Sequence, residues 1–399
     1  MQGRRRVATA FAGGVLLLAA LDQLAQHTLL EGGEFLGRRI APFDPPLFCR
    51  AQRSALAWVR SLLERGEDSL GVMDFDAELG WCPRPGAGES EMRFDWAGCR
   101  IGAAPLPRER TPGVRRILTV GCSFTFGQEV GALESWPAQL DQALADVEVA
   151  NLGVGAYGLD QALLRLRRDG RPLAPDEVWL GLMLEATARL VNTYRPAQQH
   201  WTGEMSFKPR FVLDPRGGIE LVPSPARSPR ELVELIEDQE RFVAAVGGSD
   251  YWVARAPLAY APSGSSVWHA SALGRLWLTV QERGDRGARK WLVDRSSEVF
   301  RLTSAIVVEA AREAEGVGAG FKVLVLPNRR ELRDLAAERH RFWAELCGNL
   351  SAHGVAVWDL SEGLLAAGAA EEDSFWAPDG HYSARGNRVV ARLLIGRMR

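Results

Sequence analysis

The sequence predicts an α/β protein, a three-layer α/β/α sandwich around a central parallel sheet. From residue 115 onward, short apolar runs alternate with longer amphipathic segments. Buried parallel strands are short, continuous apolar runs, and parallel neighbours are joined by helical crossovers. Five runs have strand length: Ile117–Val120, Val147–Leu152, Val178–Met183, Phe321–Leu326 and Val355–Leu360. The segments expected to be helical are Leu133–Ala145, Leu159–Arg168, Glu331–Leu350 and Ser383–Arg397.

Composition limits the classes of function. The 399 residues are 46% hydrophobic, which is enough to build one large or two medium domains. A formal net charge of −2 gives no electrostatic basis for nucleic-acid binding. The five cysteines lack C-x-x-C spacing, so no metal centre is predicted, and no cofactor either.

The amino terminus predicts export and a membrane anchor. Arg4, Arg5 and Arg6 precede Val7–Leu21, in which Thr9 is the only polar residue. This is the pattern of the n-region and h-region of an export signal. We expect residues 1–30 to be a retained signal anchor, a membrane helix that leaves the rest of the chain extracytoplasmic, in the periplasm or outside the cell. A cleaved signal peptide is the alternative.

Two further segments frame the predicted main domain. Residues 31–110 are expected to be a lead-in that packs on the domain at 111–399, with a helix over Ala51–Leu63. An insertion at about 196–300 breaks the α/β rhythm and is expected to cover the active site. It contains a predicted hairpin, an acidic helix and an aromatic region: Phe211–Asp214 with Ile219–Val222, Arg230–Val246, and Tyr251, Trp252, Tyr260, Trp268 and Trp277. These aromatics are either core residues or surfaces on which sugar rings stack.

The first candidate catalytic residue is Ser123. It follows the first core strand within the stretch Gly121-Cys122-Ser123-Phe124-Thr125-Phe126-Gly127. Ligands of open α/β sheets bind at the carboxyl ends of the strands, where this hydroxyl would lie. A serine in this place is also a common turn or N-cap residue. The stretch differs from the G-x-S-x-G elbow, because Thr125 replaces the second glycine.

A nucleophilic serine requires a base and an acid that orients the base. Of six histidines, His381 stands just before the last predicted helix, in Asp379-Gly380-His381. An acid two residues before a histidine, with glycine between, allows both side chains to face one site.

Together these segments resemble the SGNH (GDSL-type) hydrolases, a superfamily of serine esterases and acyltransferases with a flavodoxin-like fold. Its first block is Gly-Asp-Ser-Phe/Leu-Thr-x-Gly, and the stretch around Ser123 is similar to it, with Cys122 in place of aspartate. Its second block, Asn-x-Gly-x-x-Gly, resembles residues 151–158, Asn-Leu-Gly-Val-Gly-Ala-Tyr-Gly, with Ala156 in the place of the last glycine of the block. The resemblance implies that Ser123 is the nucleophile, His381 the base and Asp379 the acid. It also implies that the backbone N–H groups of Ser123 and Ala156 bind the oxyanion.

The third block of that superfamily departs most in this chain. The block normally supplies an asparagine side chain to the oxyanion, but Glu185 stands there. We expect Asn192 or Arg189 to replace it, with Glu185 paired by Arg189, four residues on, or by another cation.

The resulting hypothesis is a membrane-anchored serine acyl-ester hydrolase acting on an O-acylated small molecule or polysaccharide. An O-acyltransferase with the same triad is the first alternative. A catalytically weak carbohydrate-binding or assembly protein is the second. Cys122 as the nucleophile is a minor alternative. A dinucleotide site at Gly153-x-Gly155-x-x-Gly158 is another, because the acidic residue of that fingerprint follows a strand, whereas Asp176 precedes its strand.

Overall fold

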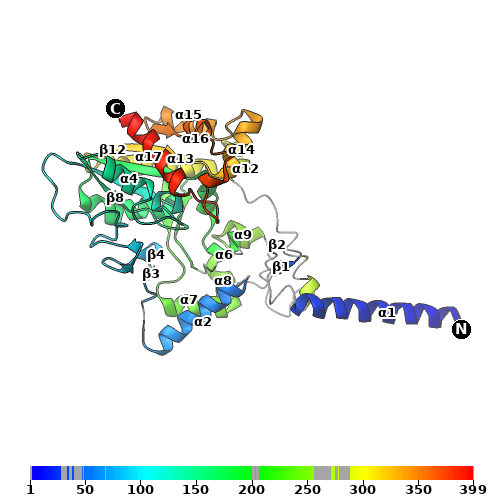
Figure 1. The fold of residues 1–399 in the computed structure, drawn as a ribbon. Helices are drawn as coiled ribbons and strands as arrows, with labels where there is room; N and C mark the ends of the chain where they lie inside the picture. Colours follow the sequence, from blue (N-terminus) through cyan, green and yellow to red (C-terminus); the bar gives the residue numbers. More distant parts are fainter. Residues whose placement is uncertain are drawn as a thin grey trace. The chain divides into compact units, whose positions relative to one another are not determined.

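The computed structural model describes residues 2–27, 34–35, 38–39, 47, 49–67, 69–199, 203, 206–255, 271–274, 277 and 288–398. The chain forms two compact units (Figure 1). The first consists of Met1–Asp68, Asn192–Phe207 and Pro225–Arg286, and the second of Ser69–Val191, Lys208–Ser224 and Gly287–Arg399. Each unit is described by itself.

A five-stranded parallel sheet is the centre of the second unit. Its strands are β7 (Arg115–Gly121), β8 (Val147–Asn151), β9 (Glu177–Leu182), β12 (Gly320–Val325) and β13 (Ala356–Asp359), in the order β13-β12-β9-β7-β8. Numbered by sequence, this is the order 2-1-3-4-5 of flavodoxin-like folds. All five strands predicted from the apolar runs are present. The predicted α/β class with a parallel sheet is therefore confirmed.

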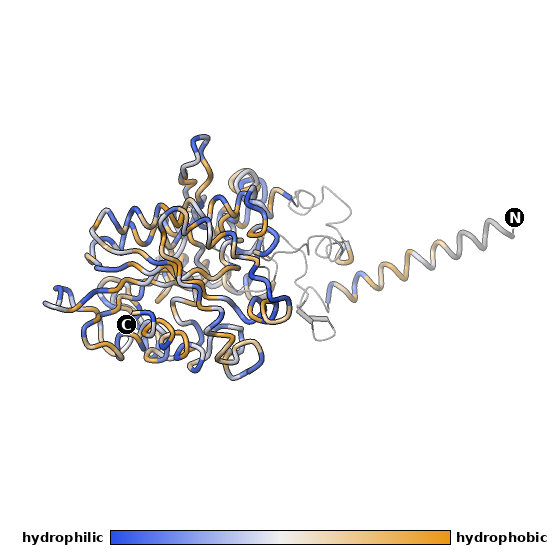
Figure 2. The backbone as a smooth tube through the Cα atoms, turned by 90° about the horizontal axis from the view of Figure 1, so that it is seen from above, coloured by the Kyte–Doolittle hydropathy of each residue, from blue (hydrophilic) through white to orange (hydrophobic). Residues whose placement is uncertain are grey.

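Helices cover both faces of this sheet. From β7 the chain moves to β8 at one edge of the sheet, and every later crossover moves toward the opposite edge. Because these connections are right-handed, α4 (Trp136–Ala143) covers one face of the sheet and α5 (Leu159–Arg165) covers the other. Helix α17 (Ala384–Met398) packs on α4, and α13 (Glu298–Glu315) packs on α5 and β12. Figure 2 shows hydrophobic and hydrophilic stretches alternating along the backbone.

The remaining elements of the second unit are short. They are β3 (Met73–Asp76), β4 (Gly80–Pro83), β5 (Gly88–Glu89), β6 (Met92–Arg93), α3 (Ser123–Phe126), the π-helical segment η2 (Leu166–Gly170), the 3₁₀ segments η3 (Arg171–Leu173), η4 (Leu184–Val191) and η5 (Asp373–Phe375), β10 (Arg210–Leu213), β11 (Ile219–Val222), α12 (Arg289–Leu292), α14 (Arg329–Glu338), α15 (Ala344–Ala352) and α16 (Ser361–Ala366). The predicted hairpin is present as β10 paired with β11. The second unit therefore contains part of the lead-in segment, in β3 to β6, and the hairpin of the expected insertion.

The first unit is helical in its described part. It contains α1 (Gln2–Ala25), α2 (Arg50–Glu64), α6 (Arg195–Gln198), α7 (Pro229–Glu237), α8 (Gln239–Val246) and α9 (Tyr251–Arg255), with a two-residue pair β1 (Glu34–Phe35) and β2 (Arg38–Arg39). Helix α2 packs on α7 and matches the predicted helix at 51–63. Tyr260 and Trp268 of the predicted aromatic region lie outside the described residues.

The membrane-anchor prediction is not supported by the described helices. Helix α1 spans the predicted segment, and leucines such as Leu16 and Leu17 on it are exposed. Within the described ranges, no helix combines the length and the apolar character that crossing a bilayer requires.

Two predicted long helices are each broken in two. The acidic segment at 230–246 divides into α7 and α8 because the Asp238 carboxylate accepts hydrogen bonds from the backbone N–H groups of Glu240 and Arg241, which begins a new helix. The segment at 331–350 divides into α14 and α15 after Arg339, whose φ of +57° ends α14.

Candidate active site

Ser123 lies where the first core strand ends. Strand β7 ends at Gly121, Cys122 is extended, and Ser123 begins the short helix α3. The turn is tight. Gly121 has φ +150°, and a Cβ atom there would lie 2.4 Å from the Thr125 hydroxyl. Ser123 is 6% exposed, and Cys122 is part of the hydrophobic core. The core position of the Cys122 side chain does not favour a role as nucleophile.

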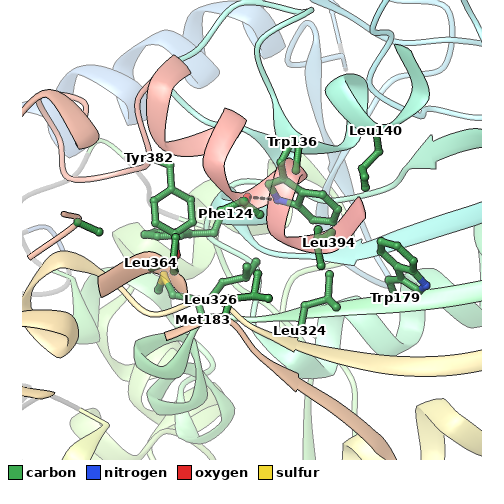
Figure 3. Packing of buried hydrophobic residues seen from close by; sticks show 14 of the residues in the cluster. Phe124, Trp136, Leu140, Trp179, Met183, Leu324, Leu326, Leu364, Tyr382 and Leu394 are labelled. Atoms are coloured by element: carbon green, nitrogen blue, oxygen red, sulfur yellow. Dashed lines mark hydrogen bonds between the residues drawn. The ribbon is translucent and has the colours of Figure 1, made fainter. Parts of the chain in front are cut away.

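The residue after Ser123 is fixed from two sides. The Trp136 indole donates a 2.9 Å hydrogen bond to the Phe124 carbonyl, and the Phe124 ring meets the Tyr382 ring edge-on at 4.8 Å (Figure 3). The ring of His381 lies 5.4 Å from that of Phe124. The loop before α17 therefore brings His381 against the residue next to Ser123.

The second block is tied to the first by Asn151. Its amide donates to the carbonyls of Thr125 and Phe126 at 3.3 and 3.2 Å, and its Oδ1 accepts from the Gly153 N–H at 3.0 Å. A Cβ atom on Gly153 would lie 2.5 Å from the Phe126 nitrogen, so only glycine allows this approach. Ala156 follows with φ +63°, a left-handed conformation that alanine rarely adopts. These contacts bring the loop of Ala156 to the segment that begins at Ser123.

His381 pairs with Glu129, a residue that the sequence analysis did not identify. The Nδ1 atom of His381 lies 2.6 Å from the Glu129 carboxylate. The same carboxylate accepts the backbone N–H groups of Asp379 at 2.8 Å and of His381 at 3.3 Å. Glu129 follows the first block closely and has φ +68°, an uncommon backbone state of the kind found at functional sites.

These hydrogen bonds determine the charge of Glu129 and the tautomer of His381. Burial acts to raise the pKa of the Glu129 carboxyl, but the hydrogen bonds from Asp379 and His381 outweigh it and hold that pKa below its ordinary value. An ionised carboxylate only accepts hydrogen bonds, so Nδ1 of His381 carries the proton. Nε2 is then the basic nitrogen, as a general base requires.

Arg100 holds the loop that carries Glu129. Its guanidinium donates to the carbonyls of Phe126 at 2.8 Å, Val130 at 2.6 Å and Gly127. Burial lowers the pKa of Arg100 to about 10, against the opposing charge of Glu91. The loop on both sides of Glu129 is therefore fixed by one buried cation.

Two predicted site residues have other surroundings than expected. Asp379 was predicted to orient His381, but its side chain is exposed and its contact with the pair is the backbone N–H to Glu129. Asn192 was predicted to donate to the oxyanion. It belongs to the first unit, where its amide hydrogens go to the Tyr194 carbonyl and the Asp250 carboxylate. Both donor hydrogens of the Asn192 amide are therefore already used.

Glu185 is turned to a different partner from the one predicted. Its carboxylate accepts a 3.2 Å hydrogen bond from the Asn328 amide, whereas Arg189 donates to the Tyr157 carbonyl at 2.7 Å. The expected pair with Arg189 assumed an α-helix, in which residues four apart share a face. The segment is a 3₁₀ helix, in which residues three apart align.

Comparison with known proteins gives similarity at the level of structure. No protein-family model and no curated protein matches the chain. Among solved structures, it is similar to a member of the lipolytic protein G-D-S-L family from Veillonella parvula, at 12% identity and a TM-score of 0.34, covering 71% of this chain and 97% of that one. An acetylxylan esterase from Geobacillus stearothermophilus gives 11% identity and a TM-score of 0.39, with 72% and 95% covered.

A two-domain esterase active on acetylated mannans is also similar, at 9% identity and a TM-score of 0.32 over 71% of this chain and 49% of that one. Identities and TM-scores this low do not transfer an activity or a substrate. The fold assignment therefore rests on the strand order and on the position of the two blocks.

Proposed function

We propose that this chain is a serine acyl-ester hydrolase in which Ser123, His381 and Glu129 form the triad. The observation that carries the proposal is the Glu129 carboxylate on Nδ1 of His381, on a loop that starts at the end of the Ser123 helix. A carboxylate, an imidazole of defined tautomer and a serine at a strand end are the three parts of acyl transfer through a serine.

The reaction follows from these roles. The Ser123 hydroxyl attacks the carbonyl carbon of the ester while its proton passes to Nε2 of His381. The carbonyl oxygen becomes an oxyanion, which the backbone N–H groups of Ser123 and Ala156 stabilise. The alcohol leaves with the proton from Nε2, and an acyl-serine remains. Water then attacks the acyl carbon while its proton passes to Nε2. The bond to Ser123 Oγ breaks, Nε2 returns the proton to that oxygen, and the carboxylic acid leaves. Glu129 stabilises the imidazolium in both steps.

An O-acylated carbohydrate is the substrate class that we propose. The support is the set of similar solved structures, two of which are described as an acetylxylan esterase and as an esterase active on acetylated mannans. An O-acyltransferase would use the same acyl-serine and pass the acyl group to a sugar hydroxyl in place of water. Addition of a sugar acceptor during turnover distinguishes the two reactions, because only a transferase forms the acylated sugar.

The test of the proposed function uses the full chain, p-nitrophenyl acetate and a fluorophosphonate that labels activated serines. We expect labelling and hydrolysis in the wild type and neither in Ser123→Ala, with the thermal unfolding temperature unchanged. Cys122→Ala is the matched neighbour and should keep both. Labelling that persists in Ser123→Ala, or disappears with Cys122→Ala, contradicts the assignment. Absence of both activities in a folded wild type favours a binding or assembly protein.

Export of the chain is a further part of the proposal, supported by the arginine cluster before Val7–Leu21. Residues 1–30 fused to a reporter that is active only outside the cytoplasm should give activity. Activity confined to fusions that lack this segment would contradict extracytoplasmic location.

A further inference from the structure

The turn that carries Ala156 is held by an indole from the lead-in segment. Trp81 in β4 donates through Nε1 to the carbonyl oxygen of Gly155 at 3.1 Å, across 74 positions of sequence. Gly155 C=O and Ala156 N–H belong to one peptide group. In a planar trans peptide these two bonds point in opposite directions. Fixing the carbonyl toward Trp81 therefore aims the Ala156 N–H away from Trp81.

Trp81 is itself well fixed. It pairs with Phe75 in the β3–β4 hairpin, and its carbonyl accepts the hydroxyl of Tyr157 at 2.5 Å. The two aromatic rings meet edge-on at 5.5 Å, and Tyr157 is fully buried. The Tyr157 carbonyl is in turn held by Arg189 at 2.7 Å. Carbonyls on both sides of Ala156 are thus tied to the surrounding structure.

The N–H of Ala156 is the group that this arrangement leaves available. Across the residues that the structure describes, no acceptor takes a hydrogen bond from it. Ala156 is only 9% exposed, and unpaired N–H groups are rare among buried residues. Its left-handed backbone is disfavoured for alanine, so the turn would relax by rotation of the peptide if nothing held it.

We propose that Trp81 is a positioning residue for the oxyanion: its indole N–H fixes the Gly155–Ala156 peptide so that the Ala156 N–H points into the reaction site. The inference rests on the proposed function. The hydrogen bond to the carbonyl also polarises the peptide and strengthens the N–H as a donor. Because an oxyanion forms only during the reaction, Trp81 acts on the transition state and leaves binding of the ground-state ester unchanged.

The chain offers a matched control for this role. Trp96 also donates its indole N–H to a backbone carbonyl, that of Leu106, at 2.8 Å. Trp81→Phe and Trp96→Phe each remove one indole–carbonyl bond and keep an aromatic ring. Only the first bond holds the peptide of Ala156.

The experiment measures kcat and KM for p-nitrophenyl acetate and the affinity of an alkylboronate, whose tetrahedral serine adduct places an oxygen where the oxyanion forms. Loss of a whole oxyanion donor typically costs about 10²–10³ in kcat. We expect Trp81→Phe, which misaims a donor without deleting it, to lower kcat about 10- to 100-fold. KM should change less than about twofold, and boronate affinity should fall by a similar factor to kcat. Trp96→Phe should stay within about twofold in every quantity.

Tyr157→Phe is the second variant, for use if Trp81→Phe does not fold. It removes the hydroxyl that fixes Trp81 and should lower kcat several-fold, again without a change in KM. A Trp81→Phe enzyme with wild-type kcat, or with a raised KM alone, overturns the positioning role. This result is distinguishable from failure of the proposed function, in which the wild type itself shows no Ser123-dependent hydrolysis.

Discussion

Replacement of Glu129 by Gln is the most direct test of the site. The substitution keeps the shape of the side chain and removes the charge that lies 2.6 Å from Nδ1 of His381. Charges about 4 Å apart, at an effective dielectric constant of about 20, interact by about 4 kcal/mol. The side chains of His381 and Glu129 are 21% and 14% exposed, so water screens part of this energy. The Glu129 charge then stabilises the His381 imidazolium by about 3 kcal/mol, and loss of this stabilisation corresponds to about a 100-fold decrease in kcat.

The matched control is Asp379→Asn. Asp379 contacts Glu129 through its backbone N–H, which the substitution retains, and its side chain is exposed. We therefore expect Glu129→Gln to lower kcat for p-nitrophenyl acetate about 100-fold, and Asp379→Asn to lower it less than about threefold. The opposite ranking, with Asp379→Asn the more damaging, would show that the acid two residues before His381 orients the base and that the pairing with Glu129 is incidental.

The pH dependence of stability follows from the same contacts. Hydrogen bonds from Asp379 and His381 hold the pKa of Glu129 below its ordinary value in the folded chain, although burial acts in the other direction. A lowered folded pKa means that the ionised carboxylate contributes stability above its unfolded pKa. That contribution is lost as the pH falls through the folded pKa. Thermal unfolding should show a wild type more stable than Glu129→Gln near pH 6, with the difference shrinking as the pH is lowered below about 4.

Three further substitutions test other parts of the site. Glu185→Asn should keep kcat within about threefold, since this exposed carboxylate is bound to Asn328; a tenfold loss in steady-state assays would assign Glu185 a catalytic role. Arg100→Met should lower the free energy of unfolding in urea by about 3 kcal/mol, because it leaves buried carbonyls without a donor, and an unchanged value would contradict that clamp. Ala156→Gly removes the strain at φ +63° and should raise the unfolding temperature or leave it unchanged, with a lower temperature contradicting the strain.

The sheet was predictable because its signal is local. Each of the five strands coincides with a short apolar run; β7 and β9 in the middle of the sheet are buried almost throughout, whereas the edge strand β13 is only partly buried. The observed strand bounds differ from the predicted ones by one or two residues where polar residues at a strand end also pair with the neighbouring strand, as Arg115 does. The broken helices were missed because a single residue interrupts an otherwise regular apolar pattern. At Asp238, capping of the next helix outweighs continuation of the first.

The site was predictable only in the residues that belong to motifs. Ser123 and His381 stand in recognisable blocks, whereas Glu129 contacts His381 across 252 positions. A left-handed backbone at Glu129 aims its carboxylate at the histidine loop, and no side-chain pattern predicts that conformation. The available signal was an acid immediately after Gly127-Gln128, close to the proposed nucleophile. Asp379 carries the stronger sequence signal, because it stands only two residues from the base.

The lead-in segment shows why such contacts leave so little trace in a sequence. Trp81 holds the Gly155 carbonyl and Arg100 holds the carbonyls around Glu129, so both loops of the site depend on residues before the first core strand. In each case the acceptor is a backbone oxygen, which every residue type carries. These hydrogen bonds therefore do not restrict the residue type at the acceptor positions. Only the donor side chains, Trp81 and Arg100, could indicate the contacts in the sequence. A segment without periodicity, classed by its sequence as a lead-in, supplies the hydrogen bonds that set the direction of the proposed oxyanion donor and of the carboxylate on His381.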